Sequence, residues 1–414
     1  MTLRSVEEQL ARVLAAVRPP AVEQMPLDQA SGRVLAEPAS ARSAVPPFDN
    51  SAMDGFAVRF EDVAHAAAEH PVSLRVVADL PAGSALDPAI GPGEAARIMT
   101  GAPVPTDADA IIPLEDTAGG LADSLATAVV LSAPRRPGVH VRAAGEDAAA
   151  GSQVLPAGIR LGARQLSALA SAGIAQVVVA RRPRVLAVAT GSELVPPGQP
   201  LTRGTIPESN SLLIAGLVAE TGAEVIGRRV VDDSGDGPAE AVALAADLAA
   251  DLVIFSGGVS AGAYEVVRQS LGNAMEFTKV AMQPGKPQGF GVTDAGLLLF
   301  GLPGNPVSAA VSFEVFVRPA LLRMQLVPED PRAVWRLPAG ERWRSAPGRR
   351  QYLPAVIDRS DPARPVVRPA GRGGSGSHLV VGLGGAEAYA IVPEAVTSVE
   401  AGDLVDVVLL DPGP

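Results

Sequence analysis

The hydrophobic and polar positions of the chain follow several periods, and each period predicts a different kind of element. Residues 5–17 place apolar side chains on one helical face, and Ser5 and Glu8 stand at the spacing of a capping box. A pair of prolines ends this segment, and a second short helical piece is expected around 27–35. The N-terminal region is therefore predicted to begin with helices.

From about 56 to 158 the pattern changes to short β-rich runs separated by Gly and Pro. Two prolines, an Asn and an Asp-Gly pair predict a well-fixed loop at 45–57. Strands are expected at 72–78, 95–100, 110–114, 128–132 and 139–143. The region is predicted to be a small β domain, followed by a helix at 161–172 and a strand at 174–179.

Strand and helix periods alternate regularly after the linker-like segment 181–183. Strands are expected at 185–189, 224–231, 252–255, 276–280 and 297–300. Helices are expected at about 209–221, 238–249, 264–271 and 306–325. This alternation predicts a parallel sheet with helices on both faces. Past Pro328 the helical period stops, and 334–414 is predicted to be a C-terminal β domain, so the fold class is a multidomain α/β protein.

Three glycine-bearing turns between 251 and 308 define the centre of this α/β region. They read SGGVS at 256–260, QPGKP at 283–287 and GLPGNP at 301–306. In an open α/β sheet, ligands bind at the edge where the parallel strands end. Glycine lets backbone N–H groups approach an anion, and Asn305 and Pro306 start a helix whose N-terminus adds partial positive charge. These turns are the predicted ligand-binding edge.

Charged residues at the same edge indicate the chemistry of the ligand. Glu193, Asp232, Glu265 and Lys279 all lie just after predicted strands. Taken singly, Glu193 is equally well a solvated loop acid, Asp232 part of a helix cap, and Glu265 a first-turn acid favoured by the helix dipole. Together the acids offer hard oxygen ligands that suit Mg²⁺, which usually bridges one or two carboxylates to substrate phosphates.

Lysine usage singles out the middle turn. Lys279 and Lys286 are the only lysines among 34 Lys and Arg residues. One explanation is a compositional drift towards Arg that left two lysines by chance. The other is that a compact ammonium is needed here and a planar guanidinium would not serve.

Composition narrows the function classes. The 414 residues suffice for two to four domains, and 47% of them are hydrophobic. A net charge of −11 argues against a nucleic-acid partner, and the lack of Cys excludes disulfides and thiolate metal sites. Lys286 precedes Pro rather than Ser or Thr, so there is no Walker P-loop. No apolar run approaches the ~20 residues that span a membrane, and no signal peptide is recognisable, so a cytoplasmic protein is expected.

Longer motifs surround these residues. They read PPFDNSAMDGFA at 46–57, RIMTGAPVP at 97–105, GED at 145–147, TGSEL at 190–194, SGGVS at 256–260, PGKP at 284–287 and GLPGNPVS at 301–308. In these motifs and in their order, the chain resembles the molybdopterin molybdenumtransferase family, which includes MoeA and the gephyrin E domain. The likeness covers essentially the whole chain.

The resemblance implies four structural regions. These are a discontinuous N-terminal domain of residues 1–44 and 145–180, an inserted β domain of 45–144, a molybdopterin-binding α/β domain of 181–327 and a C-terminal β domain of 328–414. It also implies an elongated homodimer whose active site lies between the subunits. The implied reaction uses adenylylated molybdopterin and molybdate: molybdenum enters the pterin dithiolene, the phosphoanhydride is cleaved and AMP leaves, with Mg²⁺ as the ion. Further contacts with molybdopterin adenylyltransferase and molybdoenzymes are implied, and neither nucleic acid nor a membrane is.

By motif position, the resemblance assigns functional residues along most of the chain. The implied catalytic residues are Asp54, Thr100, Asp147, Glu193, Asp232, Glu265 and Lys279. The three implied Mg²⁺ ligands are Glu193, Asp232 and Glu265. The implied substrate-binding residues are Ser256, Gly257, Gly258, Ser260, Pro284, Gly285, Lys286, Gly304, Asn305, Ser308 and Ser377. Within these sets, Lys279 and Ser377 would offer donors to the molybdate oxygens.

Three positions depart from the family pattern. Glu265 stands where Asp is more frequent, and Gln283 stands where many members carry a second Lys. The Arg expected early in the C-terminal domain has no clear match, because Leu353 occupies its neighbourhood and Arg349 and Arg350 come slightly earlier. The preference between molybdate and tungstate therefore stays open.

Two other functions compete with the transferase. A scaffold or binding protein of the gephyrin E-domain type would have no need of Glu193, Asp232 and Lys279 together, and it would release no AMP. The adenylylation step is performed by single-domain relatives of 181–325, whereas this chain has three further regions. Measuring AMP release separates the transferase from the scaffold.

Overall fold

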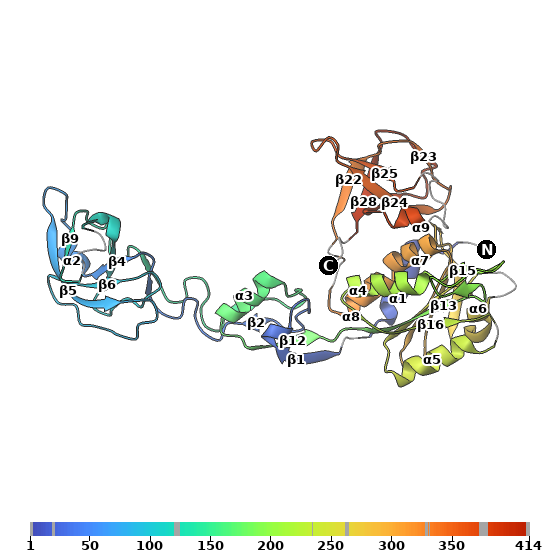
Figure 1. The fold of residues 1–414 in the computed structure, drawn as a ribbon, viewed down its shortest axis with the longest axis horizontal. Coiled ribbons are helices and arrows are strands. Elements are labelled where there is room, and N and C mark those ends of the chain that lie inside the picture. Colours follow the sequence, from blue (N-terminus) through green and yellow to red (C-terminus); the bar gives the residue numbers. More distant parts are fainter. Residues whose placement is uncertain are drawn as a thin grey trace.

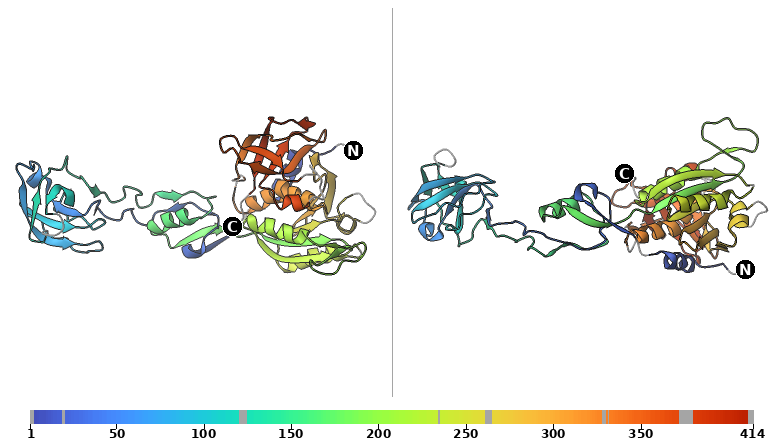
Figure 2. Two further views of the ribbon diagram at one scale, coloured as in Figure 1. Left: turned by 45° about the horizontal axis from the view of Figure 1, so that its top comes forward. Right: turned by 90° about the horizontal axis from the view of Figure 1, so that it is seen from below.

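The computed structural model describes residues 3–18, 21–119, 125–233, 235–260, 265–327, 330, 332–371 and 380–410. The molecule is elongated, with a small β domain at one end and a larger body at the other (Figure 1). A narrow middle part connects them, and the two further views show the same separation (Figure 2). No helix in the described ranges is long and apolar enough to cross a membrane.

The body is built on a sheet with the strand order β16-β13-β17-β21-β20-β18. Its strands are β13 (Arg184–Thr190), β16 (Glu224–Val231), β17 (Leu252–Ser256), β18 (Met275–Lys279), β20 (Pro287–Val292) and β21 (Leu298–Leu302). β16, β13, β17 and β21 pair in parallel, as the alternation predicts. β20 runs antiparallel to both of its neighbours, so the sheet is mixed rather than all parallel.

β20 is the strand of this sheet that the hydrophobic pattern does not predict. Gly289 and Gly291 interrupt its apolar run, and the structure explains both glycines. A Cβ at Gly291 would lie 2.0 Å from the Ala274 carbonyl oxygen, and one at Gly289 would lie 2.9 Å from the Phe277 ring. Close packing against β18 therefore requires glycine where a strand pattern would show a larger residue.

Helices cover both faces of the sheet, as expected. They are α4 (Asn210–Glu220), α5 (Gly237–Asp247), α6 (Val266–Leu271), α7 (Pro306–Ser312) and α8 (Arg318–Met324). Ile254 packs in the core with α4, α7 and α8, whereas Val253 and Phe255 pack with α5 and α6. Successive side chains of β17 thus serve opposite cores, as in a strand buried on both faces. The helix expected at 306–325 is interrupted by a π-helical turn, Phe313–Val317.

The first helix, α1 (Val6–Ala16), has the capping box formed by Ser5 and Glu8. Its buried residues Val6 and Val13 belong to the core of the α/β body. The helix contacts α8 and the π-helical turn, so it packs on the body although the first domain was expected to span 1–44. The domain boundaries otherwise remain a prediction.

The narrow middle part pairs segments that are distant in sequence. β1 (Val22–Pro26) pairs with β12 (Gln176–Ala180), and β2 (Ala39–Ser40) pairs with β11 (Gln153–Leu155). The expected helix at 161–172 is confirmed as α3 (Ala163–Ser171). The piece expected at 27–35 is only a 3-10 turn, Leu27–Gln29. Gly32 has a φ of +73°, and its N–H bonds to Leu161, which turns the chain away from a helix.

The distal β domain confirms the predicted run of short strands. Its sheet has the order β7-β4-β6-β5-β9-β8. The strands are β4 (Gly55–Val58), β5 (Val72–Leu80), β6 (Glu94–Ile98), β7 (Ala110–Pro113), β8 (Thr117–Ala118) and β9 (Thr127–Val130), with a short α2 (Phe60–Val63) and a 3-10 turn (Leu114–Asp116). At its base, β3 (Asn50–Ser51) pairs with β10 (Val141–Arg142). The expected loop at 45–57 thus contains β3 and most of β4.

The C-terminal domain has a sheet of order β19-β24-β26-β28-β22. Its elements are β22 (Val334–Pro338), β23 (Trp343–Arg344), β24 (Arg350–Asp358), β25 (Val366–Pro369), α9 (Val380–Leu383), β26 (Ala388–Val392), β27 (Ser398–Val399) and β28 (Leu404–Leu409). β19 (Met282–Gln283) comes from the α/β region and pairs with β24. The middle glycine turn is therefore connected directly to the C-terminal sheet.

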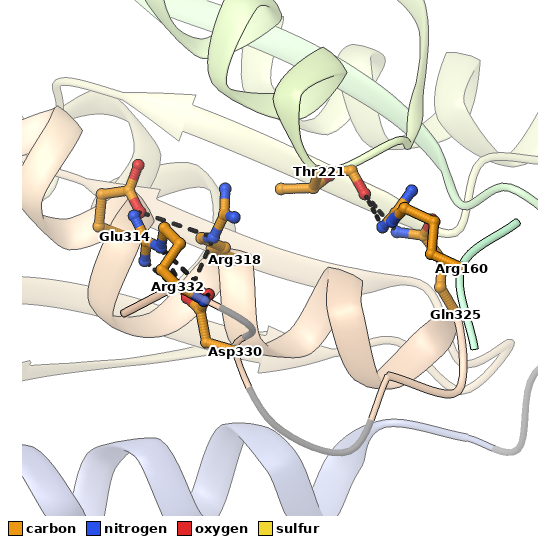
Figure 3. Close-up of polar contacts among 7 residues, drawn as sticks. All are labelled: Arg160, Thr221, Glu314, Arg318, Gln325, Asp330 and Arg332. Carbon is orange, nitrogen blue, oxygen red and sulfur yellow. Dashed lines mark hydrogen bonds and ion pairs between the residues drawn. The ribbon is translucent and has the colours of Figure 1, made fainter. Parts of the chain in front are cut away.

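A polar joint ties the narrow middle part to the body (Figure 3). The Arg160 guanidinium donates to the carbonyl of Gly32 at 2.9 Å and to that of Thr221 at 3.2 Å. Gln325 donates to the same Thr221 carbonyl at 3.0 Å, so the C-terminal ends of α4 and α8 meet Arg160 at one point.

A second, buried cluster lies nearby in the same view (Figure 3). Arg332 lies 2.7 Å from the Glu314 carboxylate and 2.6 Å from that of Asp330, while Arg318 lies 3.1 Å from Asp330. Burial raises the pKa of Glu314, and both guanidinium groups oppose that rise. The cluster fastens the π-helical turn to the segment that leads into the C-terminal domain.

Candidate functional site

A cavity of about 490 Å³ lies at the edge of the sheet where the parallel strands end. The turns after β13, β17 and β21 border it, together with the start of α4 and the small strand pair β14 (Leu194–Val195) and β15 (Ile206–Pro207). A larger cavity of about 700 Å³ lies at the opposite edge of the sheet, away from every predicted site residue. The cavity at the carboxyl ends is therefore the candidate site.

The cavity floor is formed by glycine turns that lie against one another. Gly257 has a φ of +97°, and a Cβ there would lie 2.7 Å from the Thr190 carbonyl oxygen. A Cβ at Gly304 would lie 3.4 Å from the Gly257 Cα atom. The first and third turns thus approach each other at backbone distance, as predicted for an edge that presents main-chain groups to a ligand.

Two acids of the lining accept main-chain hydrogen bonds, and a third lies close against a glycine. The Glu193 carboxylate folds back over Gly191, where a Cβ would lie 2.5 Å from its Oε2 atom. Glu265 accepts a hydrogen bond from the Ser260 N–H at 2.8 Å, and Asp233 accepts one from the Ser192 N–H at 2.9 Å. These carboxylates are therefore placed by the turns themselves.

Asp232 is exposed and is not part of the lining, whereas its neighbour Asp233 is. Both acids follow the end of β16 at Val231, and Asp233 lies in a bend that brings it, and not Asp232, to the cavity. The described residues contain no cluster of three or more metal-ligating side chains. Glu193, Asp232 and Glu265 therefore do not form a closed cage by themselves.

Sequence reasoning did not single out two residues at the start of α4. Glu208 is 5% exposed, and its carboxylate accepts from the N–H and the hydroxyl of Ser211 at 2.8 and 2.6 Å. Asn210 donates from Nδ2 to the Gly304 carbonyl at 2.7 Å. The available signal was the polar run ESNS at the start of a predicted helix that follows the Glu193 turn.

The lysines lie outside the lining. Lys279 is exposed at the end of β18, and Lys286 is half-buried beside the lining residue Pro287. Within the described lining there is no Lys or Arg, but there are four acids: Glu193, Glu208, Asp233 and Glu265. The cavity wall is therefore rich in hydrogen-bond acceptors.

The middle turn is rigidly packed. A Cβ at Gly285 would lie 2.8 Å from the Ser312 hydroxyl. Gln288 donates to the Gly285 carbonyl at 2.6 Å and to the Ser312 hydroxyl at 2.7 Å. Pro284 is buried in this packing. The backbone that carries Lys286 is thus held against α7.

The remaining predicted residues of this edge differ in exposure. Ser308 lies buried in the first turn of α7. Ser256 is 1% exposed, and its hydroxyl has no hydrogen-bond partner among the described residues. Ser260 is exposed, and Asn305 occupies the N-cap position of α7 without a capping hydrogen bond from its side chain. Ser377 lies outside the described residues.

Asp54 and Thr100 form a pair in the distal β domain, far from the cavity of the same chain (Figure 1). The Thr100 N–H and hydroxyl donate to Asp54 Oδ1 at 2.7 and 2.8 Å, and these bonds hold the pKa of Asp54 below its usual value. Asp147 is exposed between β10 and β11, and its N–H bonds to Val45. None of these three residues lines the cavity of its own chain.

Arg350 is engaged in the contact between α1 and the C-terminal domain. Its guanidinium lies 2.5 Å from Glu7 and 3.1 Å from Glu394. Burial opposes a rise in its pKa, but the contacts with Glu7, Tyr352 and Glu394 outweigh burial and raise it. Leu353 is buried in β24. Arg350 therefore stabilises a domain contact.

Comparison with known proteins covers the chain in three consecutive parts. Residues 4–173 match the family "MoeA N-terminal region (domain I and II)", 186–323 match "Probable molybdopterin binding domain" and 336–410 match "MoeA C-terminal region (domain IV)".

Full-length relatives agree with these matches. Molybdopterin molybdenumtransferase 2 of Mycobacterium tuberculosis is 45% identical over 414 residues, 97% of this chain and 98% of the relative. Molybdopterin molybdenumtransferase of Bacillus subtilis is 33% identical over 98% of this chain and 94% of its own length. The crystal structure of a molybdopterin biosynthesis MoeA protein from Pyrococcus horikosii superimposes with a TM-score of 0.82, at 32% identity over 99% of both chains. With this fold, these turns and this similarity along its length, the chain belongs to the molybdopterin molybdenumtransferase family.

Proposed function

We propose that the chain transfers molybdenum from molybdate to the dithiolene of adenylylated molybdopterin, with cleavage of the phosphoanhydride and release of AMP. The observation that carries this proposal is the cavity at the carboxyl ends of β13, β17 and β21, bordered by the glycine turns of the family motifs. Similarity to molybdopterin molybdenumtransferases over the whole chain supports it.

The glycine turns bind and orient the substrate in this mechanism. Gly258 and Gly304 line the cavity, and their backbone N–H groups would donate to phosphate oxygens, while the Gly257 N–H bonds to the Leu302 carbonyl and fixes the turn. The N-terminus of α7 adds partial positive charge. Phosphoanhydride cleavage needs little covalent help from the protein, so positioning and charge neutralisation are the main contributions. Lys286 is next to the lining residue Pro287 and would contribute positive charge there, and Lys279, at the end of β18, would donate to the oxyanion.

Mg²⁺ is the ion that we propose for this site. A lining with four acids and no described Lys or Arg would repel an anhydride that arrived without a cation. Mg²⁺ usually binds one or two carboxylates together with substrate phosphates, so it needs no closed protein cage. Glu193 and Glu265, with Asp232 or Asp233, would hold it, and the ion would neutralise charge on the anhydride oxygens.

We further propose a homodimer in which Asp54 and Thr100 of one subunit complete the cavity of the other. The distance between the distal domain and the body within one chain supports this arrangement (Figure 1). Asp147 lies on the segment that returns from the distal domain and would act from the same arm. The nucleotide-bearing substrate supports a cytoplasmic setting, with molybdopterin adenylyltransferase and molybdoenzymes as the expected contacts.

AMP release from adenylylated molybdopterin tests the proposal. The purified chain should release AMP in a molybdate-dependent manner, and Glu193→Gln should reduce this release strongly while the fold is retained. A folded wild-type chain that binds the substrate but releases no AMP would favour the scaffold function instead.

A further inference from the structure

The orientation of the Asn210 side chain is determined by a contact across the cavity edge. Its Nδ2 atom donates to the Gly304 carbonyl at 2.7 Å, which joins the first residue of α4 to the third glycine turn. The opposite orientation of the amide would bring two acceptor oxygens together. Asn210 Oδ1 is therefore the atom that remains for another partner.

Asn210 Oδ1 is buried and has no hydrogen-bond partner among the described residues. Buried polar atoms of folded proteins nearly always have a partner, so this acceptor calls for an explanation. Asn210 borders the cavity at the carboxyl ends of the strands. A molecule bound in that cavity is the nearest source of a donor.

The surroundings of Asn210 indicate the chemistry of that donor. Glu208 is buried two residues earlier, and each of its oxygens accepts one hydrogen bond from Ser211. A carboxylate oxygen has a second lone pair, so Glu208 keeps acceptor capacity towards the cavity. Because the described lining offers no Lys or Arg, this part of the wall suits a neutral group with N–H donors better than it suits a phosphate.

We propose that Asn210 is a specificity-determining residue whose Oδ1 accepts a hydrogen bond from the N–H edge of the substrate's heterocycle. The inference rests on the proposed function, because it assigns one end of adenylylated molybdopterin to this wall. Both ends of that substrate carry such an edge: the pterin has ring N–H and amino donors, and the adenine has an amino donor. A site built to bond an N–H discriminates strongly against a ligand that lacks it.

The experiment measures the dissociation constants of molybdopterin and of AMP separately, on the full-length protein. Asn210→Ala removes both the acceptor and the bond to Gly304. It should weaken one of the two probes at least about tenfold, or ~1.4 kcal/mol, and change the other by less than about threefold. The weakened probe identifies the heterocycle that Asn210 contacts. Asn210→Ser, which keeps a polar but shorter side chain, should shift the same probe.

Asn210→Asp separates the two contacts of the amide. It keeps an acceptor at the position of Oδ1 and loses the donor to Gly304. The ratio of the two dissociation constants should therefore stay within about threefold of the wild-type ratio, because an acceptor oxygen remains at the position of Oδ1. Asn273→Ala is the matched control, since it makes the same chemical change on an exposed turn of the same domain, outside the lining.

Equal weakening of both probes by Asn210→Ala would mean that Asn210 only supports the Gly304 turn, and unchanged binding of both would mean that a solvent molecule serves Oδ1. Either result overturns the inference while leaving the proposed function intact. Failure of the wild-type protein to bind either probe would overturn the proposed function, and this inference with it.

Discussion

Lys279 occupies the end of β18, where its carbonyl accepts the Arg4 N–H at 2.9 Å. The backbone is thus held while the side chain is exposed. A rotatable ammonium can meet a tetrahedral oxyanion there, whereas Arg adds length and a planar fork. We expect Lys279→Arg to keep the fold and to lower molybdate-dependent turnover at least about tenfold, or ~1.4 kcal/mol. Separate titrations of molybdate and of adenylylated molybdopterin check this.

Lys286 provides the comparison for that experiment. It is half-buried next to Pro287 in the lining, so Lys286→Arg should mainly weaken binding of the pterin nucleotide. If Lys279→Arg matches the wild type in both titrations, the two lysines remain only by chance in a composition that favours Arg, and they have no special role.

The hydrogen bonds from Thr100 lower the pKa of Asp54. The Thr100 N–H, and then its hydroxyl, hold the pKa of Asp54 low, so this carboxylate contributes stability that is lost as the pH falls through its folded pKa. Thr100→Val removes the hydroxyl donor and should raise the pKa of Asp54 towards its usual value. The acid limb of the activity profile should then move to higher pH, which carboxyl NMR and a pH–rate profile can measure.

Asp87 offers a matched control within the same domain. The Thr106 N–H and hydroxyl donate to it at 2.8 Å each, and these bonds lower its pKa in the same way. Thr106→Val should raise the pKa of Asp87 and leave the activity profile unchanged. An acid limb that moves equally in both variants would refute a specific role for Asp54.

Among the elements, the π-helical turn between α7 and α8 depends on a buried ion cluster. The side chains of Glu314 and Arg332 are 6% and 7% exposed. Removing one partner of a buried ion pair leaves an uncompensated charge, which typically costs roughly 3–5 kcal/mol. We therefore expect Arg332→Ala to lower the free energy of unfolding by about that amount in denaturant titrations.

Arg336→Ala is the control for the cluster. Arg336 pairs with Asp406 on the surface with 73% of its side chain exposed, and such pairs contribute about 0–1 kcal/mol. Equal losses of stability in the two variants would show that burial of the cluster does not determine its contribution.

The sequence predicted an element correctly where the spacing of its apolar residues stayed regular over a whole strand or helix. β13, β16, β17 and β21 follow their apolar runs closely. β20 escaped prediction because the close approach of β18 requires Gly289 and Gly291, and that approach is a tertiary contact. The 3-10 turn at Leu27–Gln29 replaced a helix because Gly32 pairs with a segment more than a hundred residues away.

For the candidate site, too, the sequence predicted the local features and not the contacts between distant residues. The glycine turns are local features that short motifs reveal. The bond between Asn210 and Gly304 joins residues 94 positions apart, and the bond between Asp54 and Thr100 joins residues 46 positions apart. Neither pairing can be read from local spacing. The local sequence also does not show that Asp233 rather than Asp232 lines the cavity, because both follow directly after β16.

At the scale of the whole molecule, the elongated shape sets up a complementation experiment. The proposed dimer takes Asp54 from one subunit and Glu193 from the other. Mixing folded Asp54→Ala and Glu193→Ala chains should restore a fraction of the activity, because some mixed dimers hold one intact site. Activity assays on mixtures, with size measurements to confirm that mixed dimers form, check this. Mixed dimers that stay inactive would contradict the shared site.

Metal removal tests the proposed ion independently. Mg²⁺ would serve the substrate phosphates and not the fold, since the described residues form no metal cage. EDTA should therefore abolish AMP release without changing the far-UV circular dichroism, and added Mg²⁺ should restore the activity. A loss of secondary structure on chelation would assign the ion a structural role instead.

The pairing of β3 with β10 at the base of the distal domain places Asn50 opposite Arg142. Adjacent strands lie about 5 Å apart, so the chain enters and leaves this domain at neighbouring positions. The residues between these two strands form a single insertion in the chain. We expect that this segment could be exchanged for a longer or shorter module without rerouting the remaining chain. Such an exchange would change the length of the distal part of the molecule, and it would change the position of Asp54 and Thr100 with it.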